Sequence, residues 1–295
     1  MTAPGPADPA LENSPFDRGL RRLRRDRAAR SGAEANPLLR RIADDLLERL
    51  DLVTRRFEHA LDLGSGPGLL AAALRAQGMQ VTACDAGAVF SRAGGEQCDE
   101  DRLPFEPGSF DLVVSAGTLD SVNDLPGALI QIRRLLRPDG LFLGAFAGAG
   151  SLPVLRGALA AADEAEQRPA SPRLHPQIDL RAAGDLLARA GFALPVADDE
   201  PLTVRYSALP QLVADLRSLA WTNLLSTRSR DPFRRLGYAA ALAAFSGAAD
   251  PDGKVPERFR IIHLSGWAPS PDQPQPARRG SATASLADAL RRKPG

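Results

Sequence analysis

The sequence is poor in lysine, cysteine and histidine. Lysine occurs only at Lys254 and Lys293, so arginine supplies nearly all of the 37 basic residues. The 2 cysteines, Cys84 and Cys98, are too few for a disulfide-stapled secreted domain and form no CxxC metal pattern, so we expect buried thiols in a reducing, cytoplasmic location. The longest uncharged run, 141–155, is shorter than the ~18 apolar residues of a membrane span and contains glycines, so we expect no transmembrane segment.

The overall composition is that of an ordinary soluble globular protein. Basic and acidic residues nearly cancel at 37 against 36, giving a net charge of +1, and 44% of the residues are hydrophobic. This balance excludes collagenous, disordered and strongly nucleic-acid-seeking chains. The first fifteen residues carry acidic residues and prolines but no arginine, so we interpret 1–15 as a disordered lead-in and not as a targeting signal. The proline-rich segment 269–295 is typical of a linker-like tail.

Short apolar runs alternate with helical patterns through the middle of the chain. Strands are predicted at 59–64, 79–85, 109–115, 140–148, 193–206 and 260–268. Helices are predicted at 16–30, 36–50, 69–77, 124–136, 152–166, 179–190, 208–219 and 231–246. This alternation indicates βαβ units and a parallel sheet with helices on both faces, an α/β fold. We place one domain at 16–268, with the helices at about 150–250 inserted as a substrate cover.

A glycine-rich loop follows the first predicted strand. It reads Asp62-Leu63-Gly64-Ser65-Gly66-Pro67-Gly68, and Asp85 ends the next strand. Glycines at the carboxyl end of a parallel strand let a nucleoside approach the backbone, and a carboxylate beside them accepts hydrogen bonds from both ribose hydroxyls. We therefore predict a nucleoside-cofactor site. A glycine turn that binds nothing is the alternative.

The spacing of the loop bears on which nucleoside it binds. A dinucleotide G-x-G-x-x-G pattern that starts at Gly64 fails at Leu69, while one that starts at Gly66 matches only in its G-x-G-x-x-A form through Ala71. An acidic residue two positions before G-x-G-x-G resembles the first motif of class I S-adenosylmethionine-dependent methyltransferases, which implies that Asp62 lies near the methionine end of the cofactor. A cationic ammonium group and sulfonium suit that carboxylate better than a pyrophosphate would.

Three later stretches resemble further motifs of that superfamily. They are the run from Asp99 to Phe105, the run from Gly108 to Ser115, and Leu136-Arg137-Pro138-Asp139-Gly140. The resemblance implies that Asp99 reaches the adenine amino group and that Ser115 borders the methyl donor. It also places Ala86 and Glu100 in the cofactor site. A solvent-facing acidic loop is the alternative for 99–101.

The likeness extends to one family over most of the chain. Residues 16–29, 122–142, 188–206 and 266–290 look like the methyltransferase-like mitochondrial complex I assembly factor 5 family and its bacterial relatives, with the biotin-pathway malonyl-acyl carrier protein methyltransferase as a more distant cousin. The resemblance implies a Rossmann-like class I methyltransferase fold, with a mostly parallel seven-stranded sheet whose last strand is antiparallel. It also implies S-adenosylmethionine as the cofactor and, for the mitochondrial member, hydroxylation of an arginine on a complex I subunit.

The chain departs from that family where the reaction would take place. Family members typically carry a His-Trp pair after the fourth strand, and this chain has Asp120-Ser121 there. Asp120 and Asn123 are catalytic candidates by position alone, and an aspartate would replace an imidazole base only with an altered pKa. The 3 histidines form no H-x-D or H-x-E pair, so we predict no metal site.

Three functions from different classes follow from the sequence. The first is S-adenosylmethionine-dependent methyl transfer to a protein or small acceptor, in the assembly of respiratory complex I. The second is hydroxylation of an arginine on a complex I subunit, and the third is a non-catalytic assembly role. In each case a complex I subunit is the expected protein partner, and it would hold the protein peripheral to the inner membrane.

Seven arginines cluster in the first predicted helix. Between residues 16 and 30 they outnumber two aspartates, and Phe16, Leu20 and Leu23 form the apolar stripe. Because no aromatic side chains are interleaved with the arginines, we do not expect nucleic-acid binding. The segment is predicted to be a lid over the cofactor site or a docking surface for an acidic partner.

Overall fold

A seven-stranded sheet forms the centre of the computed structural model, which describes residues 14–32, 36–92, 94–169 and 171–273. The strands are β1 (His59–Leu63), β2 (Gln80–Asp85), β3 (Glu96–Gln97), β4 (Phe110–Ala116), β5 (Leu136–Ala147), β6 (Ala193–Tyr206) and β7 (Val255–Trp267). Their order across the sheet is β3-β2-β1-β4-β5-β7-β6. Strands β1 to β5 run parallel, whereas β7 pairs antiparallel with both β5 and β6. The predicted mostly parallel sheet with an antiparallel last strand is confirmed.

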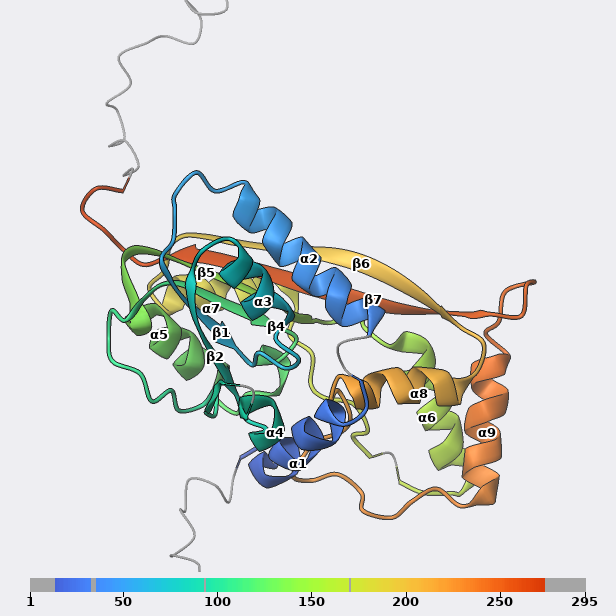
Figure 1. The fold of residues 1–295 in the computed structure, drawn as a ribbon. Helices are drawn as coiled ribbons and strands as arrows, with labels where there is room; N and C mark the ends of the chain where they lie inside the picture. The colour runs from blue at the N-terminus through green and yellow to red at the C-terminus, as the bar shows by residue number, and fades with distance from the viewer. Residues whose placement is uncertain (1–13, 33–35, 93, 170, 274–295) are drawn as a thin grey trace, which may run out of the picture.

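Helices cover both faces of the sheet (Figure 1). They are α1 (Arg18–Ala29), α2 (Pro37–Asp51), α3 (Leu69–Ala76), α4 (Ala88–Ser91), α5 (Leu125–Leu135), α6 (Pro153–Ala165), α7 (Leu180–Arg189), α8 (Leu209–Ser218) and α9 (Arg235–Ser246), with a 3-10 turn at Leu119–Ser121. Apolar residues of α2, α3, α6, α8 and α9 share one core, and those of α5 and α7 share the other. Alternation along the strands supplies both cores, because Leu112 and Val114 of β4 face the first and Val113 faces the second.

Helix α2 begins where the sequence predicts it. Asn36 is the N-cap: its side-chain oxygen accepts hydrogen bonds from the backbone N–H groups of Leu38 at 3.0 Å and Leu39 at 3.3 Å. Pro37 occupies the first helical position, where no N–H donor is needed. From there α2 lies along β6 and β7, which extend past the short parallel strands (Figure 1).

The predicted alternation of elements agrees with the structure except at two short ones. Strand β3 and helix α4, both within 88–97, are too short to give a periodic signal. The strand predicted at 260–268 begins earlier, at Val255. The proposed lead-in at 1–15 and tail at 269–295 fall almost wholly outside the described residues. Within the described ranges, no helix is both long and apolar enough to cross a membrane.

Cys84 and Cys98 form a disulfide bond, so the prediction of two free thiols is wrong. Cys84 lies in β2, and the chain returns beside it in β3, where Cys84 is in register with Glu96. The backbone N–H of Cys98 then donates to the carbonyl oxygen of Asp85 at 3.0 Å. The Cα atoms of the two cysteines are 5.8 Å apart, within the usual range for a disulfide. The short return strand that brings them together left no signal in the sequence.

Candidate functional site

The glycine loop turns sharply at the carboxyl end of β1. Gly64, Gly66 and Gly68 have φ angles of 73°, 53° and 79°, which glycine adopts without a steric cost. A Cβ atom on Gly64 would also collide with the side chain of Thr118, which follows β4. The backbone N–H of Gly64 donates to the carbonyl oxygen of Cys84 at 2.8 Å. The loop therefore lies directly against the ends of both neighbouring strands, as a nucleoside site requires.

Asp62 lies in β1, where it is buried beneath the loop. Its side chain reaches the first turn of the helix that follows, α3. Its Oδ2 accepts a hydrogen bond from the backbone N–H of Ala71 in α3, at 3.0 Å. Burial raises the pKa of Asp62 to about 7, and the charge of Asp85 adds to that shift, while the Ala71 hydrogen bond opposes it. A cationic ligand group beside Asp62 would relieve the cost of ionising it.

Asp85 accepts hydrogen bonds from backbone and side chain at once. The backbone N–H of Gly66 donates to its Oδ2 at 2.9 Å, and that of Gly87 donates to its Oδ1 at 2.8 Å. Arg25 pairs with both carboxylate oxygens. Burial alone would raise the pKa of Asp85, but Arg25 and the two amides bring it below the ordinary value. The carboxylate predicted for a ribose is thus ionised and fixed in orientation.

Three arginines of α1 point into this end of the sheet. The ion pairs are Arg18 with Asp99 and Glu100, Arg21 with Glu100, and Arg25 with Asp85. Positions 18, 21 and 25 share one face of the helix, and the side chains of all three are less than a tenth exposed. The structure therefore places α1 over the carboxylates that the sequence assigns to the cofactor, where a lid was predicted.

The apolar side of α1 is narrower than predicted. Phe16 is buried against Leu224 and Leu225, and Leu20 packs on the same small cluster. Leu23 is 44% exposed, so its predicted packing is wrong. The inward face of the helix carries arginines instead, because the buried carboxylates beneath it need positive partners.

A cavity of about 20 Å³ remains between α1 and the glycine loop. Arg25, Asp62, Ser65, Phe90 and Trp221 are among the residues that line it. This space holds about one water molecule, whereas ligand sites for drug-sized molecules span roughly 300 Å³ or more. A nucleoside would therefore have to displace the Arg25 side chain in order to contact Asp85.

The remaining predicted cofactor residues lie along the same edge of the sheet. Ala86 is buried, and its carbonyl oxygen accepts a hydrogen bond from the Gln97 side chain at 3.0 Å. The hydroxyl groups of Ser115 and Thr118 are hydrogen-bonded at 3.0 Å beside the glycine loop. Burial would raise the pKa of Asp99, but the paired Arg18 lowers it overall, so this acid is also ionised.

Asp120 lies at the end of the loop that follows β4. Its Oδ2 is 3.7 Å from Nδ1 of His175, and among the described residues its buried Oδ1 has no hydrogen-bond partner. Nε2 of His175 accepts from the backbone N–H of Leu224 at 2.9 Å, which leaves the ring proton on Nδ1, toward Asp120. His175 therefore presents its N–H toward Asp120 at a distance longer than a hydrogen bond.

Asn123, the second catalytic candidate, is engaged with the backbone. Its Oδ1 accepts from the N–H of Phe16 at 2.8 Å, and its Nδ2 donates to the Phe16 carbonyl at 3.3 Å. The side chain therefore anchors the segment before α1, and its catalytic role stays a prediction.

Two ring side chains that the sequence did not assign reach the end of β4 from the segment after residue 150. His175 faces Asp120, and the indole N–H of Trp221 donates to the carbonyl oxygen of Gly117 at 2.7 Å. An imidazole and an indole are thus present near Asp120-Ser121, where the sequence resemblance led us to expect a His-Trp pair. The only sequence signal was the rarity of both residue types, at 3 histidines and 2 tryptophans.

A cavity of about 920 Å³ opens beside His175. Its wall combines α6 with residues of 171–177 and 225–227, and it includes Leu159, Leu174 and Leu225 together with Arg156 and Glu164. Its size suits a side chain or a small acceptor. Of the helices at about 150–250, α6 therefore lines this cavity, and the role of the inserted helices as a substrate cover stays a prediction.

Comparisons with known proteins agree with this arrangement. A protein-family profile described as a methyltransferase domain matches residues 61–144. The human protein arginine-hydroxylase NDUFAF5, mitochondrial (Homo sapiens), is 34% identical over 284 residues, which cover 92% of this chain and 82% of the relative. Malonyl-[acyl-carrier protein] O-methyltransferase of Laribacter hongkongensis is 32% identical over 266 residues, which cover 83% and 87%. The solved YcgJ protein of Bacillus subtilis superposes with a TM-score of 0.52 at 17% identity, covering 77% of this chain and 99% of that one.

Proposed function

Because this chain belongs to the class I methyltransferase-fold family that includes arginine-hydroxylase NDUFAF5 and malonyl-[acyl-carrier protein] O-methyltransferase, we propose that it binds S-adenosylmethionine and transfers the methyl group to a protein or small acceptor. S-adenosylmethionine is the cofactor of this fold. The observation that carries the proposal is Asp85, an ionised carboxylate held by two backbone amides beside a glycine loop at the ends of adjacent parallel strands.

The residues of the site fit the parts of this cofactor. Asp85 would accept the ribose hydroxyls, Asp62 would face the ammonium group, and Asp99 with Glu100 would serve the adenine end. Ser115, one residue before the end of β4, would border the methyl donor. Binding requires Arg25 to leave Asp85, because its guanidinium occupies both carboxylate oxygens.

For the acceptor we propose the large cavity beside His175. Methyl transfer from the sulfonium of S-adenosylmethionine to an acceptor needs mainly in-line positioning of the acceptor, with a base to remove its proton where the acceptor carries one. Asp120 is the group available for this, because its Oδ1 has no hydrogen-bond partner among the described residues and His175 lies 3.7 Å from the other oxygen. Asn123 is then a positioning residue that acts through Phe16.

Calorimetry with S-adenosylmethionine tests the cofactor site. We expect the unmodified chain to bind one equivalent, and Asp85→Ala to bind at least about tenfold more weakly, because two charge-assisted hydrogen bonds are lost. Asp198→Asn is the matched control, since Asp198 pairs with Arg49 on the surface of α2 and should leave binding unchanged. No detectable binding by the unmodified chain would overturn the proposal.

Hydroxylation of an arginine is the second candidate, favoured by the similarity to arginine-hydroxylase NDUFAF5 proteins that are 32–34% identical to this chain. It would add an oxygen atom to the substrate and needs molecular oxygen and a reductant. Mass spectrometry of a complex I subunit from cells with and without this gene distinguishes an added methyl group from an added oxygen. An unchanged subunit mass, together with altered complex assembly, would support a non-catalytic role instead.

The outward side of α1 favours a protein partner with acidic groups. Burial together with the nearby Arg228, Arg27 and Arg217 lowers the pKa of Arg24 to about 10. An acidic partner bound at this surface would reduce the repulsion among these arginines. A respiratory complex I subunit, expected from the family resemblance, is the partner we propose, and the cytoplasmic location stays a prediction.

A further inference from the structure

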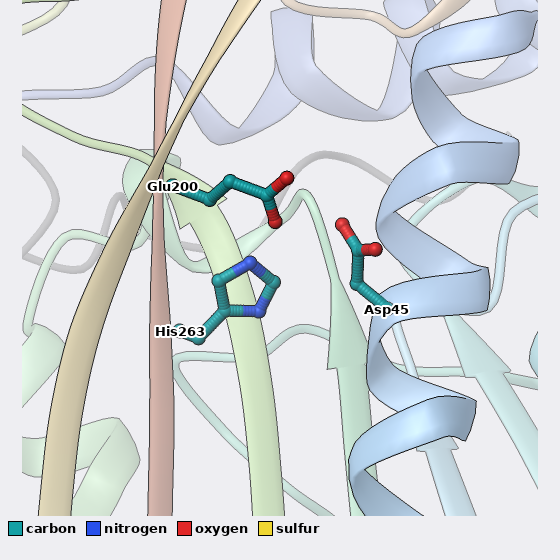
Figure 2. A group of neighbouring side chains, drawn as sticks. All are labelled: Asp45, Glu200 and His263. Atoms are coloured by element: carbon teal, nitrogen blue, oxygen red, sulfur yellow. The ribbon is translucent and has the colours of Figure 1, made fainter.

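Three side chains from distant parts of the sequence converge between α2 and the antiparallel strands. Asp45 of α2, Glu200 of β6 and His263 of β7 each offer one ligand atom, and these atoms all lie within 4.8 Å of one another. Figure 2 shows the two carboxylates and the imidazole directed toward the same gap. Strand register explains the convergence: Glu200 pairs with Ile261, two residues before His263, so both side chains leave the sheet on the face that α2 covers.

Several polar atoms of this cluster lack partners. Among the described residues, neither ring nitrogen of His263 and not the Oδ2 of Asp45 has a hydrogen-bond partner. Both residues are deeply buried, with exposed fractions of 1% and 5%. Buried polar atoms are hydrogen-bonded in the great majority of cases, so three unpartnered atoms at one point indicate a missing ligand.

The charges of the cluster are incompletely balanced. Arg41 is 2.8 Å from both an Asp45 oxygen and a Glu200 oxygen. Because its side chain is 51% exposed, solvent screens its charge and the two ion pairs contribute little to stability. Burial, with the charge of Glu200, keeps the pKa of Asp45 raised despite Arg41. The other nearby cation, Arg49, pairs with Asp198. A cation placed between the carboxylates would remove their repulsion.

We propose that Asp45, Glu200 and His263 bind a divalent transition-metal ion. One imidazole and two carboxylates form a mixed nitrogen and oxygen donor set, which suits zinc, cobalt and manganese. Ligand atoms around a tetrahedral ion with bonds of about 2.1 Å lie about 3.4 Å apart, so the ligand atoms, now within 4.8 Å of one another, must approach by up to about 1.4 Å. Glu200 can make that movement, because it lies on the edge strand β6 and its side chain is one-third exposed. Water would complete the coordination.

Such an ion would join three elements that the sequence keeps far apart. It would fix α2, from the beginning of the domain, against β6 and β7, near its end. Because a metal that binds only the folded chain raises its stability by mass action, bound metal should raise the unfolding temperature. The inference concerns a site separate from the glycine loop and does not depend on methyl transfer.

The test uses the full chain, without an affinity tag and freed of metal by a chelator. Titration with Zn²⁺ followed by calorimetry, and with Co²⁺ followed by its visible absorption, should each show one equivalent bound. Glu200→Gln should weaken binding by at least about tenfold, since a charged ligand is lost at a site where the fold tolerates change. His263→Leu should weaken metal binding to the same extent, and circular dichroism checks that this variant folds. If His263→Leu does not fold, the result for Glu200→Gln alone tests the inference.

Two control variants make the outcome specific. Asp198→Asn removes the neighbouring carboxylate on the same strand and should leave metal affinity within about twofold. Arg41→Ala removes the competing cation and should bind the ion at least as tightly. Lack of stoichiometric binding of either metal by the unmodified chain would overturn the inference. The inference would also be overturned by normal metal affinity in Glu200→Gln or by a tenfold loss of metal affinity in Arg41→Ala. Equal losses of metal affinity in Asp198→Asn and Glu200→Gln would overturn it as well.

Discussion

The carboxylates at the glycine loop and those between α2 and β7 differ in how their charge is balanced. At the glycine loop, Asp85 and Glu100 each face an inward arginine of α1 that is itself buried. Between α2 and β7, Asp45 shares the half-exposed Arg41 with Glu200, and His263 has no hydrogen-bond partner among the described residues. The first cluster is neutralised by the chain's own side chains, while the second depends on what binds there. Counting acidic residues in the sequence does not distinguish these cases, because the positive partners come from remote segments.

Removal of one arginine from each cluster tests the difference most directly. Arg21→Met should lower the free energy of unfolding by about 3 kcal/mol, because it leaves the buried Glu100 with only the longer contact to Arg18 at 3.2 Å. Arg41→Met should change it by less than about 1 kcal/mol, because Arg41 is half in solvent. Urea unfolding at pH 7 and low salt measures both. Equal losses in the two variants would contradict the contrast.

Asp120 is a third kind of carboxylate, a partly exposed side chain whose one buried oxygen has no hydrogen-bond partner among the described residues. If it is the base, Asp120→Asn should lower turnover to S-adenosylhomocysteine by about a hundredfold while cofactor affinity stays the same. His175→Gln should lower turnover less, because it removes only the group that positions Asp120. Activity of Asp120→Asn equal to that of the unmodified enzyme would assign this loop a purely structural role.

The smallest expected effect is the dependence of cofactor affinity on pH, which we attribute to Asp62. Its pKa is raised to about 7, so in the free protein it is mostly protonated at pH 6 and half ionised at pH 7. A cationic cofactor group favours the ionised form, so affinity should rise about fivefold from pH 6 to pH 7. The same raised pKa costs the native state stability as pH rises from about 4 to 7, because the unfolded chain has already released this proton.

Asp62→Asn checks both consequences of that pKa. The variant should show a flatter dependence of cofactor affinity on pH between 6 and 7, and a smaller loss of stability over the range from about 4 to 7. Calorimetry at the two pH values and thermal unfolding across the range provide the measurements. An affinity that rises as steeply in the variant as in the unmodified chain would assign the titration to another group.

The sequence predicted features that depend on neighbouring residues and missed those that depend on distant ones. The glycine loop, Asp85 and the strand–helix alternation have local signatures, and the structure brings Asp62, Gly64 and Asp85 together as expected. The sequence did not predict that arginines of α1 point inward, because helical periodicity identifies only apolar side chains as buried.

Long-range partners account for the other omissions. His175 and Trp221 reach the end of β4 from an inserted segment with no motif of its own. Asp45 and His263 are brought together by sheet register and helix packing over more than two hundred residues of sequence. Likewise, the disulfide depends on β3, a strand of two residues. Each of these pairings is fixed by tertiary structure, which a single sequence does not display.

The two hydrogen bonds between Asn123 and the backbone of Phe16 link motion at one site to geometry at the other. Phe16 leads directly into α1, whose Arg25 must leave Asp85 before a nucleoside can contact it. Asn123 is three residues beyond Asp120, which lies 3.7 Å from His175 in the wall of the large cavity. If cofactor binding moves α1, these two hydrogen bonds would transmit the movement to the segment that carries Asp120, so the two proposed binding sites would not act independently.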